Sequence, residues 1–161
     1  MSKDISKKLL LLGGSRYLLP VIELCKKHNI YTISCDYLPD NIAHQYSNEY
    51  CNARVVDTNA ILELAQEKHV DGVLSFACDP GVTTMAYVCE KLGLPCAGSY
   101  HAVDILQNKD KFRSFLKEHD FNVPKFNFYN SCKDAKVDFE QFKLPVIVKP
   151  IDCAGSKGVS R

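Results

Sequence analysis

The sequence predicts an α/β fold in which helices cover both faces of an open parallel sheet. Short continuous apolar runs, such as Lys8–Leu12 and Gly72–Ala77, are typical of buried strands. They alternate with segments in which apolar residues recur at helical spacing, as in Tyr17–Cys25. Because strands that alternate with helices pair in parallel through right-handed crossovers, we expect a Rossmann-like open sheet in the first 100 residues.

Turns and helix caps place the elements of this first region in order. Four strands are expected, at Lys8–Leu12, Ile30–Cys35, Val55–Val56 and Gly72–Ala77. Three helices follow the first, third and fourth strands, at Tyr17–His28, Asp57–Lys68 and Val82–Leu92. Asp57 is expected to cap the second helix, and Gly93 to end the third.

A different region begins at Ser99. Helices are expected at Ser99–Gln107 and Lys109–His119, and strands at Phe126–Tyr129 and Val146–Lys149. The polar stretch between these two strands is interpreted as a connection. We therefore place a Rossmann-like domain at residues 1–100 and the beginning of a second domain at residues 101–161.

Composition excludes several classes of partner. The chain has 161 residues with 20 basic and 19 acidic side chains, so its charge gives no reason to expect nucleic acid. No apolar run approaches the length of a signal peptide core or a membrane span, and we expect a cytoplasmic protein without a membrane partner.

The cysteines and histidines do not form a metal-binding pattern. Eight cysteines are present but no Cys-x-x-Cys pair, and several lie in apolar runs. Buried reduced thiols are therefore favoured over a metal site. None of the five histidines has a spacing that indicates a metal either, so no metal ligand is assigned.

The first candidate site follows the first strand. Gly13, Gly14 and Ser15 form either a simple tight turn or a loop that binds an anion at a helix N-terminus. Asp36, at the end of the second strand, would be placed to bind a ribose hydroxyl. The dinucleotide fingerprint requires a third glycine where this chain has Leu18, which disfavours an NAD-dependent oxidoreductase.

The second candidate site is the loop SFACDPG after the fourth strand. Ligands of open α/β sheets bind beyond the carboxyl ends of the strands, where Ser75 and Asp79 are expected to face the ligand. The alternative is that Asp79 and Pro80 only start the following helix.

The third candidate is the end of the sequence. Lys149 closes an apolar strand, and a Gly/Ser-rich loop with Lys157 follows. A lysine on a strand and a flexible loop that offers N–H groups and a cation together suit a triphosphate.

Two segments carry a family resemblance. NKDKFRSFLKEHDFNVP (Asn108–Pro124), followed by LPVIVKPIDCAGSKGVS (Leu144–Ser160), resembles the ATP-grasp superfamily. Within that superfamily, the leading half of the chain, with its runs LGGS, SCDYLPDNIAHQYSNEY and VLSFACDPG, looks most like carbamoyl-phosphate-synthetase-like and purine-ligase-like members. The resemblance implies that Lys111 and Lys149 contact ATP. It also implies a flap over the phosphates, formed by Gly155, Ser156, Lys157 and Gly158.

The resemblance further implies the chemistry. Enzymes of this family join a small carboxylate to an amine or another nucleophile through an acyl-phosphate, with ATP and Mg²⁺ as cofactors. Gly13, Gly14, Asp36 and Asp79 would then line the acceptor side. The metal ligands are expected beyond residue 161, so the chain is interpreted as an N-terminal fragment that is not itself catalytic.

Two further expectations accompany this interpretation. A non-catalytic Rossmann-like module that binds a small metabolite is the alternative function. The strand Val146–Lys149 is expected to be an unprotected edge, so that residues 126–161 are loosely attached, swapped, or paired with a second copy in a homodimer.

Overall fold

The chain contains two compact units. The computed structural model describes residues 7–151 and 158–161, and it divides between residues up to Val103 and residues from Asp104 onwards.

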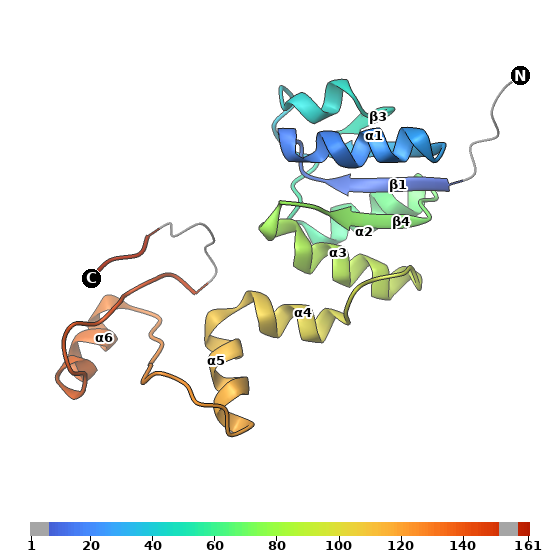
Figure 1. Ribbon diagram of the computed structural model, residues 1–161. Helices are drawn as coiled ribbons and strands as arrows, with labels where there is room; N and C mark the ends of the chain where they lie inside the picture. The colour runs from blue at the N-terminus through green and yellow to red at the C-terminus, as the bar shows by residue number, and fades with distance from the viewer. Residues whose placement is uncertain (1–6, 152–157) are drawn as a thin grey trace, which may run out of the picture. The chain divides into compact units, whose positions relative to one another are not determined.

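A four-stranded parallel sheet forms the centre of the first unit (Figure 1). Its strands are β1 (Lys7–Leu12), β2 (Ile30–Cys35), β3 (Glu49–Cys51) and β4 (Gly72–Ser75), in the order β3-β2-β1-β4. In the register of the sheet, Leu12 lies opposite Cys35 on one side and Ser75 on the other. The carboxyl ends of β1, β2 and β4 therefore lie at one edge, and the expected α/β class is confirmed.

Helices pack on both faces of this sheet because side chains of β1 alternate between them. Leu11 lies in a cluster with Leu18 and Ile22, which come from the helical turn η1 (Arg16–Leu18) and from α1 (Leu19–Lys27). Leu10 and Leu12 lie on the other face. They pack in a larger cluster with residues of α2 (Thr58–Glu67) and α3 (Asp79–Leu92): Ile61, Ala65, Val88 and Cys89.

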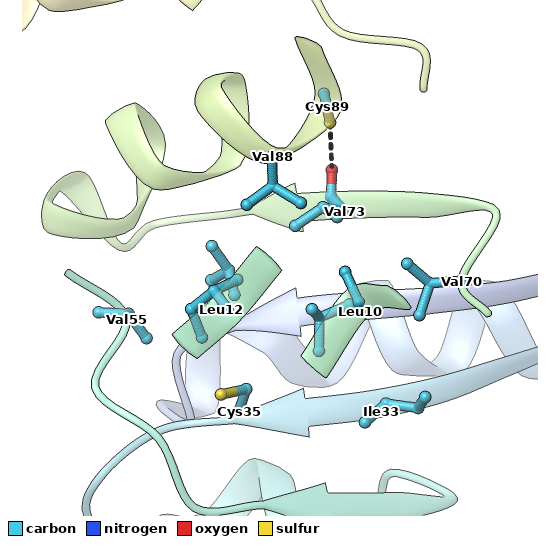
Figure 2. Close-up of a cluster of buried hydrophobic side chains, with 11 residues drawn as sticks. Leu10, Leu12, Ile33, Cys35, Val55, Val70, Val73, Val88 and Cys89 are labelled. Atoms are coloured by element: carbon cyan, nitrogen blue, oxygen red, sulfur yellow. Dashed lines mark hydrogen bonds between the residues drawn. The ribbon is translucent and has the colours of Figure 1, made fainter. Parts of the chain in front are cut away.

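The close-up of the larger cluster shows how α3 meets the sheet (Figure 2). Val88 of α3 lies over β4, and the Cys89 thiol donates to the Val73 carbonyl oxygen at 3.9 Å. Both α3 residues are fully buried. This packing holds α3 against β4, the strand that precedes it, and so positions the loop between Ser75 and Asp79.

Local signals set the ends of two helices as expected. The Asp57 side chain accepts a hydrogen bond from the Ala60 N–H at 3.1 Å and caps α2. Gly93 ends α3 in the left-handed conformation, with φ of 65°. The start of α3 differs from the prediction: the helix begins at Asp79, because Pro80 suits the first turn of a helix.

The predicted third strand was wrong. Residues Val55 and Val56 lie in a turn, with Val55 buried and Val56 exposed, and the third strand is instead Glu49–Cys51. This edge strand is held by tertiary contacts. The Asn48 side chain accepts from the Thr32 N–H at 2.9 Å, and the Lys68 ammonium lies 2.8 Å from the Glu49 carboxylate and lowers its pKa.

The second region contains α4 (Tyr100–Gln107), α5 (Lys109–Glu118), α6 (Cys132–Asp138) and the turn η3 (Phe139–Gln141). The first two were predicted, whereas α6, capped by Ser131, was interpreted as a connection.

The predicted strands Phe126–Tyr129 and Val146–Lys149 are not formed. Val148 makes an antiparallel bridge with Ser160, through hydrogen bonds of 2.9 and 2.8 Å. A ladder needs partners on successive residues, and the exposed side chains of Ile147 and Val148 contribute little burial to hold one. Within the described part of the chain, no helix has the length and apolar character needed to cross a membrane.

Candidate functional site

The loops at the carboxyl edge of the sheet carry the first two candidate sites. Gly13 follows β1, Asp36 follows β2 and Ser75 ends β4, and the strand register brings these three positions to the same edge (Figure 1). Gly14, Ser15 and Asp79 follow in the same loops. In open α/β sheets this edge is where ligands bind.

Close packing explains both glycines after β1. Gly13 adopts φ of 111°, and its N–H donates to the Cys35 carbonyl oxygen at 2.8 Å. A Cβ atom at Gly14 would come within 2.6 Å of Asn41 and of the His44 ring. The two glycines therefore form a tight turn, and the binding of an anion by this loop stays a prediction. Ser15 precedes η1 with an exposed side chain that makes no capping hydrogen bond.

The His44 ring packs against this turn at Gly14. Its Nε2 lies 3.1 Å from the Leu38 carbonyl oxygen, and its Nδ1 lies 2.8 Å from Ser34 Oγ. Because a carbonyl oxygen only accepts, Nε2 carries the proton, and Nδ1 accepts from the Ser34 hydroxyl in the neutral ring. Burial lowers the pKa of His44, which favours this neutral form.

Asp36 is held in the same loop. One of its carboxylate oxygens accepts from the Leu38 N–H at 3.1 Å, and its carbonyl oxygen accepts from the Tyr50 hydroxyl at 3.0 Å. The Tyr50 and His44 rings lie 4.1 Å apart, centroid to centroid. The Tyr50 and His44 side chains thus hold the loop that carries Asp36 through its carbonyl oxygens.

The two candidate residues of the loop after β4, Ser75 and Asp79, have different surroundings. The Ser75 hydroxyl donates to the Cys78 carbonyl oxygen at 2.7 Å, and a Cβ atom at Gly81 would come 2.7 Å from Ser75 Oγ. Ser75 therefore shapes the turn into α3. Asp79, in the first turn of α3, has an exposed side chain at the sheet edge.

The third candidate lies within the second unit, where one lysine joins two segments. The Lys109 ammonium and main-chain N–H lie 3.1 and 3.3 Å from the Ile151 carbonyl oxygen. Lys111 lies two residues after Lys109, and Lys149 lies two residues before Ile151. The structure therefore holds together the segments that carry the two predicted ATP-contacting lysines.

The flap is described only at its end. Gly155, Ser156 and Lys157 lie outside the described residues. Gly158 adopts φ of 70°, and a Cβ atom there would come 2.8 Å from Pro150. A side chain at this position would be strained and would collide with the residue after Lys149.

Cysteine placement agrees in part with the expected buried thiols. Cys25, Cys35 and Cys89 are buried, and burial raises the pKa of Cys35 to about 12. Cys96 and Cys132 are exposed, contrary to that expectation. Among residues 7–151 and 158–161, no group of three or more His, Cys, Asp or Glu side chains could hold a metal ion.

Comparisons with known proteins extend these observations. No family model matches the chain. The carbamoyl phosphate synthase large chain of Pseudothermotoga lettingae is 30% identical over 104 residues, which is 64% of this chain and 9% of that protein. The formate-dependent phosphoribosylglycinamide formyltransferase of Bacteroides fragilis is 26% identical, over 96% of this chain and 40% of its own length. The phosphoribosylamine–glycine ligase of Pyrococcus furiosus is 27% identical, over 94% and 35%.

Solved structures show the same relationship. N5-carboxyaminoimidazole ribonucleotide synthetase from Thermotoga maritima is 25% identical with a TM-score of 0.70, and the match covers 96% of this chain and 40% of that one. The fold and these matches show a chain that is similar to the N-terminal part of larger ligases and synthetases. Its relatives are ATP-grasp enzymes, and it corresponds to their N-terminal part. The resemblance expected from the sequence is thus confirmed, and the chain spans well under half the length of these relatives.

Proposed function

We propose that this chain is the front part of an ATP-dependent ligase that joins a small carboxylate to an amine or another nucleophile. The observation that carries the proposal is the contact of Lys109 with Ile151, which holds the segments of Lys111 and Lys149 together. The relatives named as ligases or synthetases match nearly the whole chain, which supports the same assignment.

On the nucleotide side, Lys111 and Lys149 contact the ATP phosphates in this proposal. Lys149 has an exposed side chain, and its neighbour Pro150 packs against the backbone of Gly158. Phosphoryl transfer depends on positioning and on neutralising charge, which the two lysines supply in this proposal. An N5-carboxyaminoimidazole synthetase from Staphylococcus aureus, with a TM-score of 0.73 and 20% identity, was solved with ADP and has the same fold.

On the acceptor side, the carboxyl edge of the sheet binds the small substrate. Exposed groups suited to a polar ligand are the Ser15 hydroxyl and the Asp79 carboxylate, with Asp36 half-buried between them in the order of the loops. The γ-phosphoryl group of ATP passes to a carboxylate oxygen of the substrate and forms an acyl-phosphate. The nucleophile then attacks the acyl carbon and displaces phosphate. The described residues assemble no magnesium ligands, so no step of this proposal is assigned to the metal.

The proposal also covers the location of the protein, its domain boundary and its association with a second copy. The names of the relatives describe enzymes of small metabolites, which supports a cytoplasmic location. The division of the chain between Val103 and Asp104 supports a domain boundary close to residue 100. The backbone of Ile147, beside the bridge from Val148 to Ser160, is the proposed edge along which a second copy of the chain pairs.

The test is a calorimetric titration of Mg-ATP into the wild-type chain and a Lys149→Ala variant. A Lys136→Ala variant, which removes an exposed lysine of α6, controls for the loss of one positive charge. The proposal expects binding by the wild type and the control and loss of binding in Lys149→Ala. Equal binding by all three, or no binding by the wild type, contradicts it.

A non-catalytic module that binds a small metabolite is the second candidate. It is favoured by the self-contained first unit, whose sheet is covered on both faces and whose candidate residues all belong to its own loops. Retained metabolite binding at this edge together with absent nucleotide binding would select the module over the ligase.

A further inference from the structure

Asp104 of α4 forms an ion pair with Lys111 of α5. The Lys111 ammonium lies 2.6 Å from one carboxylate oxygen of Asp104. The Asn108 side-chain amide donates to the other carboxylate oxygen at 2.9 Å and to the Asp104 main-chain oxygen at 2.9 Å. Both oxygens of the carboxylate are engaged, so its orientation toward Lys111 is fixed.

The pair is only partly open to water. The Asp104 side chain is 23% exposed and the Lys111 side chain is 48% exposed. Solvent screens such a pair less than one on the open surface, and a charge-assisted hydrogen bond of this length is stronger than a neutral one. A phosphate group that approaches Lys111 therefore meets a cation whose charge is already compensated by a fixed carboxylate.

We propose that Asp104 sets the affinity of Lys111 for phosphate groups by competing with them for its ammonium. This inference rests on the proposed contact between Lys111 and the nucleotide phosphates. A phosphate oxygen that takes the place of Asp104 replaces one charge-assisted hydrogen bond by another, and it lies beside the displaced negative charge. An anion with one phosphate gains little from this exchange. A polyphosphate, which makes further contacts elsewhere, overcomes the competition.

A purely structural role for the pair makes a different prediction. Asp104 and Lys111 lie on either side of Asn108, where α4 ends and α5 begins, and their ion pair joins the two helices. If that were its whole role, replacing Asp104 would lower thermal stability and leave phosphate affinity unchanged or reduced. Affinity and stability therefore separate the two roles.

The experiment compares Asp104→Asn with the wild type in titrations of Mg-ATP and, separately, of inorganic triphosphate. Removing one negative charge next to the site should tighten binding roughly threefold to tenfold. Asp104→Glu keeps the charge and should bind like the wild type, and the double variant Asp104→Asn/Lys111→Met should lose the gain. Equal or weaker binding by Asp104→Asn, or a gain that survives without Lys111, overturns the inference.

Two controls keep the result decisive. Thermal unfolding shows whether Asp104→Asn is folded, and Asp104→Ser, which also removes the charge, replaces it if it is not. If the wild type does not bind Mg-ATP, the proposed function fails, and the triphosphate titration still decides the role of Asp104. Absence of triphosphate binding by the charge-removed variants overturns the inference by itself.

Discussion

The ammonium of Lys109 lies 3.1 Å from the carbonyl oxygen of Ile151, across 42 residues of sequence. The Lys109 main-chain N–H points at the same oxygen from 3.3 Å. This contact links the start of α5 to the segment after Lys149. It therefore joins the segments that carry Lys111 and Lys149, which are far apart in the sequence. Its consequences can be measured.

Lys109→Met should weaken Mg-ATP binding roughly threefold to tenfold, because it removes one hydrogen bond between a charged donor and a carbonyl oxygen. The main-chain N–H of residue 109 keeps its contact, so the fold should survive. Calorimetry measures the affinity, and Lys109→Arg, which restores a cationic donor, should recover most of it. Unchanged affinity in Lys109→Met would remove the link between this contact and nucleotide binding.

Gly14→Ala should destabilise the first unit by about 1–3 kcal/mol, because its Cβ atom would overlap the His44 ring. Gly93→Ala is the comparison: it meets no atom within 4 Å and carries only the strain of a positive φ, about 1 kcal/mol. Urea unfolding followed by circular dichroism measures both. A Gly14→Ala protein as stable as the wild type would show that the loop shifts freely.

His44 should make stability depend on pH. Burial lowers its pKa in the folded chain, whereas the unfolded chain takes up the proton near pH 6.5. The unfolded state therefore binds more protons, and the free energy of unfolding should fall as pH falls below about 6.5, until His44 is also protonated in the folded chain. His44→Asn should lose this part of the slope between pH 5 and 8. Parallel pH profiles for the two proteins would contradict the assignment.

Ile61→Ala should cost roughly 2–5 kcal/mol, because Ile61 is fully buried in the cluster between α2 and the sheet. Val56→Ala is the matched control. Val56 lies exposed in a turn, so its truncation should change the free energy of unfolding by less than about 0.5 kcal/mol. A large loss of stability in Val56→Ala would contradict the exposed turn and would favour the buried strand that the sequence predicted at this residue.

Elements with a strong local pattern were predicted well. The run of leucines in β1, the Asp57 cap of α2 and the apolar stripe of α5 each depend on residues within one segment. Edge strand β3 was missed because Glu49–Cys51 carries no apolar run and is defined by pairing with β2 and by the contact of Glu49 with Lys68. The strand predicted at Val146–Lys149 was wrong although its sequence has a suitable apolar pattern. Among the described residues, only Val148 finds a partner there, in a single bridge with Ser160, so no ladder forms.

The sequence predicted where the loops of the candidate site lie, but it did not predict the contacts that individual side chains make there. The register of β1, β2 and β4 gathers the expected loops at one edge, as alternating strands and helices require. The contacts of Ser75 with Cys78 and of His44 with Ser34 could not be inferred, because they join residues of different segments or depend on the exact path of a loop. The same holds for Asp104 and Lys109, whose partners become neighbours only in the folded chain.

The most direct test of the central claim is a double-mutant cycle on Mg-ATP affinity with Lys111→Met, Lys149→Ala and the double variant. Because both lysines are proposed to contact one triphosphate, the account predicts that the wild type binds, that each single variant binds much more weakly, and that the two effects are not additive. Affinities that are equal in all four proteins would contradict the account, as would a wild-type chain that does not bind Mg-ATP.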